Sequence, residues 1–186
     1  MPKVFISGSM HIKKIDKKVI DHVNSIINSK NEVIIGDADG VDSSIQNYLK
    51  DMNFKTVTIY CTGSAPRNNI GRWPVKKIVS SEKPGTRAFF TAKDIQMSED
   101  CDFGLMVWDA KSTGTLSNVL QLLRQQKKSM VFVNKKKEFY EITDVQSFEN
   151  LLSVMSENAI TKADEKIRIR SKIKDMKKAK QLQLFE

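Results

Sequence analysis

Three short polar segments, each following a stretch with the pattern of a β-strand, carry the residues best suited to hold a ligand. They are residues 7–9 (Ser-Gly-Ser), 36–42 (Gly-Asp-Ala-Asp-Gly-Val-Asp) and 109–115 (Asp-Ala-Lys-Ser-Thr-Gly-Thr). Glycine allows a ligand to approach the backbone closely, and the free N–H groups at the start of a helix bind anions. The pattern therefore predicts a phosphate-binding edge. Its expected contact residues are Ser7, Gly8, Ser9, Gly36, Gly40, Ser112, Thr113, Gly114 and Thr115.

None of these segments is a specific motif on its own. The chain contains neither the Gly-x-Gly-x-x-Gly fingerprint of dinucleotide-binding proteins nor the Gly-Lys-Ser/Thr of a P-loop. Taken alone, each glycine is explained as well by a turn of the chain as by a ligand. Three such segments at one edge of a sheet favour ligand binding.

Acidic residues in the second segment are the candidates for catalysis. Carboxylates repel phosphate, so we expect Asp37 and Asp39 to hold a ribose hydroxyl or to orient a water molecule. Asp42 directly precedes a helical pattern and is expected to be its N-cap. The two histidines, His11 and His22, do not combine with cysteine at metal-ligand spacing, so neither a metal nor a bound cofactor is expected.

A long segment, residues 62–84, interrupts the regular pattern and is rich in glycine and proline. Loops of this length in compact domains are usually functional or disordered. Arginine binds phosphate with a forked geometry, and tryptophan stacks on bases, which favours a flap over a nucleotide. A packed, solvated loop is the alternative interpretation. The candidate flap residues are Arg67, Arg72, Trp73 and Arg87.

The elements that must position these segments alternate along the chain. Apolar and β-branched runs predict strands at residues 3–7, 32–35, 55–61, 102–108 and 128–134. Amphipathic spacing predicts helices at residues 16–28, 41–52, 88–98, 114–126, 144–157 and 163–180. This order is typical of an α/β fold with a Rossmann-like parallel sheet of about five strands and helices on both faces. In such a sheet the three polar segments share one edge.

Composition limits the size and the location of the protein. The chain has 186 residues, of which 40% are hydrophobic, and this supports one core. Two cysteines are too few for a disulfide framework, and the chain shows neither a secretory signal nor an apolar run of the ~20 residues that cross a bilayer. We therefore expect a cytoplasmic protein without membrane contact.

The positive charge is concentrated near the C-terminus. The formal net charge is +9, and residues 161–186 hold nine lysines and arginines against four acidic residues. A basic helical tail favours nucleic acid, although a solvated helix face is the simpler explanation. The predicted organisation is a domain at residues 1–143, a basic helical extension at 144–180 and a terminal peptide at 181–186.

The order of the polar segments resembles the SMF/DprA–LOG (SLOG) Rossmann-like superfamily and is similar to nucleoside deoxyribosyltransferase-like folds. The resemblance covers about residues 3–134 and rests on residues 36–42 and on Asp-Cys-Asp-Phe-Gly-Leu-Met-Val-Trp-Asp at residues 100–109, followed by Gly114 and Thr115. It implies binding of a nucleotide or a nucleotide derivative at the glycine-rich segments. Several members hydrolyse an N-glycosidic bond, some sense nucleotide signals, and the DprA branch binds single-stranded DNA.

The chain departs from the hydrolytic members of that superfamily. Members that resemble LOG enzymes carry Gly-Gly-x-Gly-Thr-x-x-Glu, whereas Asn118 stands at the glutamate position here, and Lys93 stands where those enzymes have arginine. Asparagine cannot act as a carboxylate base or nucleophile. The resemblance therefore favours a nucleotide-binding protein linked to DNA metabolism or nucleotide signalling. The alternative is an N-glycoside hydrolase or transferase acting on a nucleoside phosphate, with Asp37, Asp39 or Glu99 as its carboxylate.

The terminal sequence Gln-Leu-Gln-Leu-Phe at residues 181–185 resembles the bacterial sliding-clamp-binding peptide. Such an extended peptide inserts its apolar residues into a pocket while the glutamine hydrogen-bonds at the rim. A second alternative is therefore a non-catalytic clamp or DNA adaptor, and the other explanation is a terminal apolar pair that packs on the protein's own core. By analogy with SLOG-like proteins, a homodimer is also expected. The predicted clamp contacts are Gln181, Leu182, Leu184 and Phe185.

Overall fold

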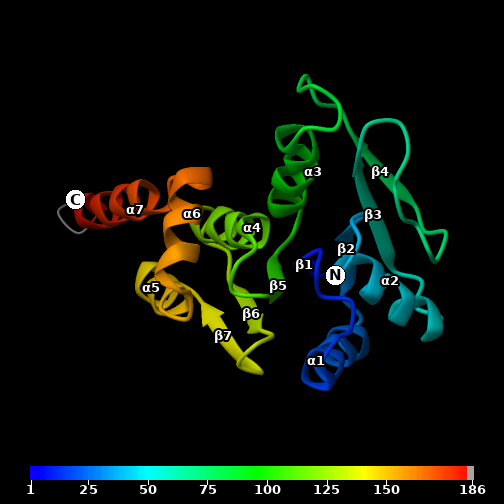
Figure 1. The fold of residues 1–186 in the computed structure, drawn as a ribbon. Coiled ribbons are helices and arrows are strands. Elements are labelled where there is room, and N and C mark those ends of the chain that lie inside the picture. Colours follow the sequence, from blue (N-terminus) through cyan, green and yellow to red (C-terminus); the bar gives the residue numbers. More distant parts are fainter. Residues whose placement is uncertain (184–186) are drawn as a thin grey trace.

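The computed structural model describes residues 1–183 and contains a seven-stranded sheet in the order β4-β3-β2-β1-β5-β6-β7 (Figure 1). The strands are β1 (Lys3–Gly8), β2 (Glu32–Gly36), β3 (Val57–Thr62), β4 (Val75–Ile78), β5 (Phe103–Trp108), β6 (Ser129–Val133) and β7 (Glu138–Ile142). The helices are α1 (Lys17–Asn28), α2 (Val41–Asp51), α3 (Arg87–Asp100), α4 (Thr113–Arg124), α5 (Val145–Leu152), α6 (Glu157–Ile167) and α7 (Ile169–Gln183).

The predicted α/β fold is confirmed, with two strands more than the sequence pattern indicates. Neighbouring strands from β4 to β6 run parallel, and β7 pairs antiparallel with β6. The additional strands, β4 and β7, form the two edges of the sheet. Edge strands need no continuous apolar run, and in β4 the exposed Lys76 and Lys77 separate two half-buried residues. The expectation that residues 62–84 form a single loop is therefore wrong.

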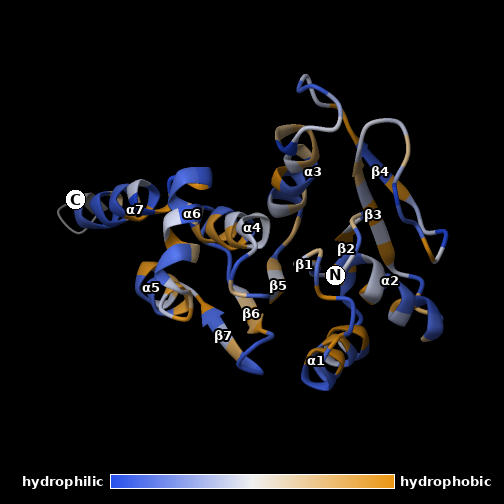
Figure 2. Ribbon diagram, in the orientation of Figure 1, coloured by the Kyte–Doolittle hydropathy of each residue, from blue (hydrophilic) through white to orange (hydrophobic). Residues whose placement is uncertain are grey.

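Helices cover both faces of the sheet, as the alternation of buried side chains along the strands requires. In β1, Val4 and Ile6 belong to the core under α1 and α2, whereas Phe5 belongs to the core under α3 and α4. Apolar colouring in Figure 2 follows the central strands and the inner sides of the helices. The result is a three-layer arrangement in which the central strands are buried on both sides.

The helical extension shares a core with the sheet. Phe148 and Leu151 of α5 and Ala163 of α6 lie in the same buried cluster as Trp108 at the end of β5. Helix α5 begins with a capping box, in which the Asp144 carboxylate accepts the amide of Ser147 at 2.7 Å. Helices α5 and α6 therefore complete one face of the fold.

The strand order creates a topological switch point at β1. The chain proceeds from β1 to β2 on one side and from β5 to β6 on the other, while β1 and β5 are direct neighbours. The loops that leave the carboxyl ends of β1 and β5 consequently diverge toward opposite faces. Open α/β sheets bind their ligands in the crevice at this place.

The shared core makes a testable prediction for stability. Truncation of Phe148 to alanine should lower the free energy of unfolding by about 3–5 kcal/mol, because a fully buried ring leaves a cavity. Urea unfolding followed by circular dichroism should show a single transition at lower urea. The control is Ile95→Ala, since Ile95 is exposed. A separate early transition, with the main one unchanged, would show that α5 unfolds independently of the sheet.

Candidate functional site

A cavity of about 690 Å³ lies at the switch point. Its wall includes Ser7 and Gly8 at the end of β1, Ala38 and Asp42 after β2, and residues 111–115 at the start of α4. Helix α3, the segment carrying Arg67, and Lys166 of α6 close the remaining sides. The three polar segments expected to converge at one sheet edge therefore do so.

The amino end of α4 presents unpaired backbone amides to this cavity. Its N-cap, Ser112, makes no side-chain capping bond, and the Asp109 carboxylate instead accepts the amides of Lys111 at 2.9 Å and Ser112 at 2.6 Å. Within residues 1–183, the amides of the next three residues, 113–115, have no acceptor. A side chain added at Gly114 would meet no atom within 4 Å, so the helix end is open. Such an end attracts anions.

Cationic side chains surround the same helix end. Arg87, Lys111 and Lys166 lie in the cavity wall, which in total holds five lysines and arginines against three aspartates. Lys172 of α7 is not part of the described wall, but burial and the nearby charges of Arg124 and Arg87 lower its pKa. Positive side chains grouped around the open amino end of a helix favour an anionic ligand.

The glycines expected to contact a ligand serve two different purposes. A Cβ at Gly8 would collide with the carbonyl oxygen of Val107, and one at Gly40, where φ is 79°, would collide with the backbone of Met10. A Cβ at Gly36 would lie 2.5 Å from Asp42 Oδ2 and 2.8 Å from Lys93 Nζ. These three glycines therefore permit close packing, and only Gly114 leaves open space at the cavity.

Ser9 connects the three polar segments without reaching the cavity. It is fully buried, its carbonyl accepts the amides of Ile12 and Val41, both at 3.2 Å, and its hydroxyl accepts the amide of Asp109 at 3.2 Å. Ser9, Gly36 and Gly40 are absent from the part of the cavity wall that the structure describes. Their place in the fold is to hold the loops in register.

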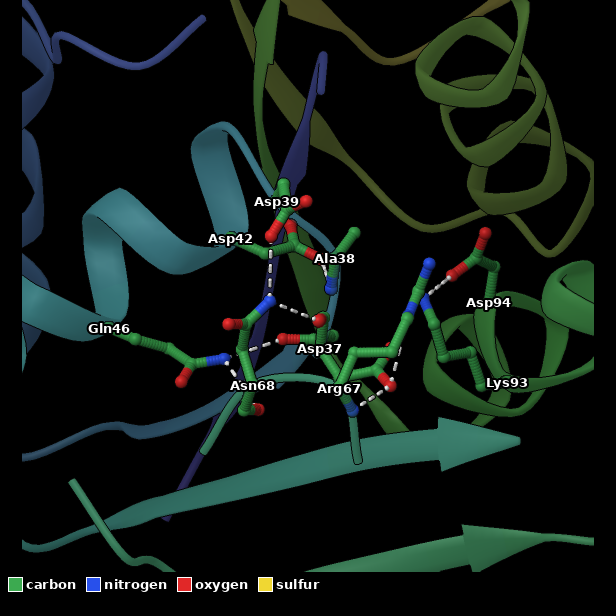
Figure 3. A network of polar contacts seen from close by, with 10 residues as sticks. Asp37, Ala38, Asp39, Asp42, Gln46, Arg67, Asn68, Lys93 and Asp94 are labelled. Carbon is green, nitrogen blue, oxygen red and sulfur yellow. Dashed lines mark hydrogen bonds and ion pairs between the residues drawn. The ribbon is translucent and has the colours of Figure 1, made fainter. Parts of the chain in front are cut away.

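The two candidate catalytic carboxylates are absent from the described cavity wall and belong to a hydrogen-bond network (Figure 3). Asp37 is buried and accepts the backbone amide of Arg67 at 3.0 Å and its Nη2 at 2.7 Å. Burial opposes the charge, but the bonds from Arg67 and the charge of Lys93 outweigh it and lower the pKa of Asp37. Asp39 is exposed and accepts Asn68 Nδ2 at 3.0 Å. Catalysis by these residues stays a prediction.

The sequence pattern predicts that Asp42 is the N-cap of α2, and this prediction is wrong. The N-cap is Gly40, and Asp42 lies at the second helical position with only 3% of its surface exposed. Its Oδ2 accepts the amide of Ala38 at 3.3 Å, and its buried Oδ1 has no hydrogen-bond partner among the described residues. Burial raises the pKa of Asp42 to about 7, although the nearby Lys93 opposes this shift. The expectation is wrong because glycine is itself an accepted N-cap and leaves the aspartate free to turn inward.

Lys93 is the buried cation opposite Asp42. It is 4% exposed, and its Nζ donates to Asp94 Oδ1 at 2.7 Å. Burial disfavours the ammonium ion, but Asp94, Asp42 and Asp37 together raise the pKa of Lys93, so the side chain is charged. Lys93 and Asp94 both line the cavity.

Sequence reasoning missed Asp94 and Phe90 and underrated Lys93. Phe90, Lys93 and Met97 are spaced i, i+3 and i+7, so they lie on one face of a helix. A lysine on this otherwise apolar face was the signal in the sequence that Lys93 is buried. The Phe90 ring lies in the cavity wall, with the Arg67 guanidinium 4.3 Å from its centroid. Asn118, at the expected glutamate position, also lines the cavity and donates to Ser7 Oγ at 3.3 Å.

The residues of the predicted flap separate in the structure. Arg67 and Arg87 reach the cavity wall, but Trp73 is buried and its Nε1 donates to the carbonyl of Phe54 at 2.9 Å. Arg72 instead borders a second cavity of about 540 Å³, next to Trp73. The four residues therefore do not form a single flap.

Comparison with known proteins identifies no relative. No protein-family model, no curated protein and no solved structure matches the chain. None of the helices in residues 1–183 is long and apolar enough to cross a membrane. In the same residues, no three His, Cys, Asp or Glu side chains are grouped to hold a metal ion. The fold defines the class of the protein as Rossmann-like α/β, and membership of the SLOG superfamily stays a prediction.

The Asp37 network predicts a structural role that can be separated from catalysis. Asp37→Asn should lower the free energy of unfolding at neutral pH by about 1–2 kcal/mol, with the partial exposure of Arg67 keeping the loss modest. Because the pKa of Asp37 is lowered by folding, this difference should be complete above the ordinary aspartate pKa and vanish as the pH falls through the lowered value.

Urea unfolding at neutral and acidic pH measures this difference directly. Asp39→Asn is the matched control, because an exposed carboxylate should change stability by less than about 0.5 kcal/mol. Equal stability of the Asp37 variant and the unmodified protein at neutral pH would refute the structural role.

Proposed function

We propose that the protein binds a nucleotide or a nucleotide derivative, with a phosphate group at the amino end of α4. The single observation that supports this most is the open helix end at residues 113–115, which faces a cavity of about 690 Å³. Unpaired amides and the helix dipole stabilise negative charge at such a place.

The groups around this helix end favour phosphate over a carboxylate. The Ser112 hydroxyl and the side chains of Arg87, Lys111 and Lys166 lie in the same wall as the three amides. A phosphate has three or more acceptor oxygens, which can bind amides and several cations together. Lys172 of α7 lies outside this wall, and its charge interacts with that of Arg87.

The rest of the cavity offers surfaces for the neutral part of a nucleotide. The ring of Phe90 and the side chain of Met10 are apolar, while Ser7 and Asn118 supply polar atoms at the end of β1. The volume falls within the range of about 300–1,000 Å³ that is usual for small-molecule sites. The proposed role is in DNA metabolism or nucleotide signalling, in line with the sequence resemblance.

Binding of nucleotides can be measured by isothermal titration with AMP, ATP, cyclic AMP and cyclic di-AMP. Gly114→Leu should weaken binding at least about tenfold without lowering the melting temperature, since the added side chain enters open space at the helix end. Arg87→Ala should weaken binding similarly, whereas Arg72→Ala, outside this cavity, is the matched control.

Two results would contradict the nucleotide site. One is the absence of binding by the unmodified protein at about millimolar ligand, an affinity that marks the weak end of specific sites. The other is unchanged binding by Gly114→Leu. Chromatography of the same mixtures distinguishes pure binding from the alternative, N-glycosidic hydrolysis, because only an enzyme releases free base.

We also propose that the C-terminal peptide binds a bacterial sliding clamp. Helix α7 carries several exposed lysines and ends at the side of the molecule remote from α1 and α2, with Gln181 exposed (Figure 1). Two of the expected contacts, Leu184 and Phe185, lie outside the described residues. Helix α7 includes residues 181–183 of the peptide, so binding in an extended form requires its last turn to unwind, and its lysines would favour the DNA that a clamp encircles.

Surface plasmon resonance with an immobilised bacterial clamp tests this second role. Deletion of residues 181–186, or Phe185→Ala, should abolish binding because the apolar anchor is lost. Gln183→Ala alters the variable position of the motif and should bind normally. Nucleotide affinity should be unchanged in all three variants. If the deletion variant binds the clamp as tightly as the full chain, the peptide is not the contact.

A further inference from the structure

The most unusual group in the cavity wall is the carboxyl of Asp42. It is 3% exposed and lies between the start of α2 and the buried side of α3 (Figure 3). One oxygen accepts the amide of Ala38, and Oδ1 has no protein partner within residues 1–183. A buried polar atom without a partner is unfavourable, so a ligand that provides one gains affinity from it.

Four charged groups interact with this carboxyl: Lys93 and Asp94 of α3, Asp37 after β2, and Arg67 of the segment between β3 and β4. The cavity wall also holds the charged or titratable side chains of His11, Arg87, Asp109, Lys111 and Lys166. Arg67 is engaged by Asp37 at 2.7 Å, and Lys93 is engaged by Asp94 at 2.7 Å.

Both cations near Asp42 are thus already paired, and Asp42 is the excess acidic group of the cluster. Burial raises the pKa of Asp42 to about 7 despite the attraction of Lys93. Near neutral pH both its charged and its neutral forms are therefore present.

We propose that Asp42 contacts the bound ligand as a neutral carboxylic acid that donates a hydrogen bond to a ligand oxygen, so that binding takes up a proton. This inference rests on the proposed nucleotide function, and it adds a recognition residue and a pH dependence to that site. In the free protein the proton has no acceptor at Oδ1, which is buried, so the Asp42 carboxyl turns toward the cavity when the ligand supplies one.

The charge of the site determines the direction of this coupling. An excess of cations in the cavity wall selects an anionic ligand, and an anion repels the charged form of Asp42. Ligand binding therefore raises the pKa of Asp42 above its value in the free protein. By linkage, affinity is constant at pH values below the free pKa and falls by up to about tenfold per unit above it.

The test measures the affinity of cyclic AMP and cyclic di-AMP between about pH 5.5 and about pH 8.5 by isothermal titration. These phosphodiesters suit the purpose because their charge is constant over this range, unlike that of a phosphate monoester, whose second pKa is about 6. The dissociation constant should rise about fivefold from pH 7 to pH 8, because half of Asp42 is already charged at pH 7. Titrations in two buffers of different ionisation enthalpy should show proton uptake at pH 7.

Variants separate the contact from its surroundings. Asp42→Asn retains a neutral donor and should bind at every pH with the affinity that the unmodified protein has at low pH. Asp42→Leu removes the donor and should bind about tenfold more weakly at all pH values. His11→Gln controls for the histidine in the same wall and should keep the pH dependence.

Asp94→Asn provides a second line of evidence should Asp42→Asn fail to fold. The charge of Asp94 raises the pKa of Asp42, so its removal should move the onset of weakening to lower pH. A dissociation constant independent of pH in the unmodified protein overturns the inference. Tighter binding as the pH rises also overturns it, because the ligand would then donate to a charged Asp42.

Failure of this inference differs from failure of the proposed function. Absence of binding by both phosphodiesters at every pH overturns the proton-linked contact. Absence of binding by every nucleotide tested overturns the nucleotide site itself. Binding with a flat pH profile leaves the site in place and removes only the role of Asp42.

Discussion

The ammonium group of Lys93 is the charge on which the arrangement of the cavity depends. It is buried in α3, donates to Asp94, and lies beside the backbone of Gly36, where any side chain would displace it. A buried charge is stable only when it is paired and hydrogen-bonded. The acidic residues at the start of α2 and after β2 are therefore placed where α3, β2 and α2 meet. Lys93, Asp94 and Asp42 of this cluster line the proposed ligand site.

The opposite wall of the cavity follows a different physical principle. There, α4 begins without a side-chain cap, and cations of α3, α6 and the segment before α4 line the cavity at its open end. The extension at residues 144–180 contributes both to the core, through Phe148, and to the site, through Lys166. Sheet, helical extension and cavity are consequently one structural unit. A ligand that spans the cavity would contact the anion-binding amino end of α4 on one side and the buried carboxyl of Asp42 on the other.

The sequence was sufficient for the central fold because buried parallel strands and amphipathic helices leave strong periodic patterns. It was insufficient for β4 and β7, since edge strands face solvent and carry lysine or alternating residues. Convergence of the polar segments was predictable from strand order. The separate uses of Gly8, Gly36 and Gly114 were not, because only coordinates reveal whether a Cβ would collide with the protein or enter open space.

The same limit applies to the acidic residues. Asp37, Asp39 and Asp42 lie within six positions of each other, yet one forms a buried ion pair, one is exposed, and one lines the cavity. Their different environments arise from residues distant in sequence, Arg67 and Lys93. Local patterns alone cannot distinguish them.

The proposed site depends on an anion binding at the amino end of α4. Titration of the ¹⁵N-labelled protein with cyclic AMP, followed by NMR, tests this most directly. The amide signals of Thr113, Gly114 and Thr115 should move first and farthest. Shifts confined to the neighbourhood of Trp73, or elsewhere outside the main cavity, would contradict it.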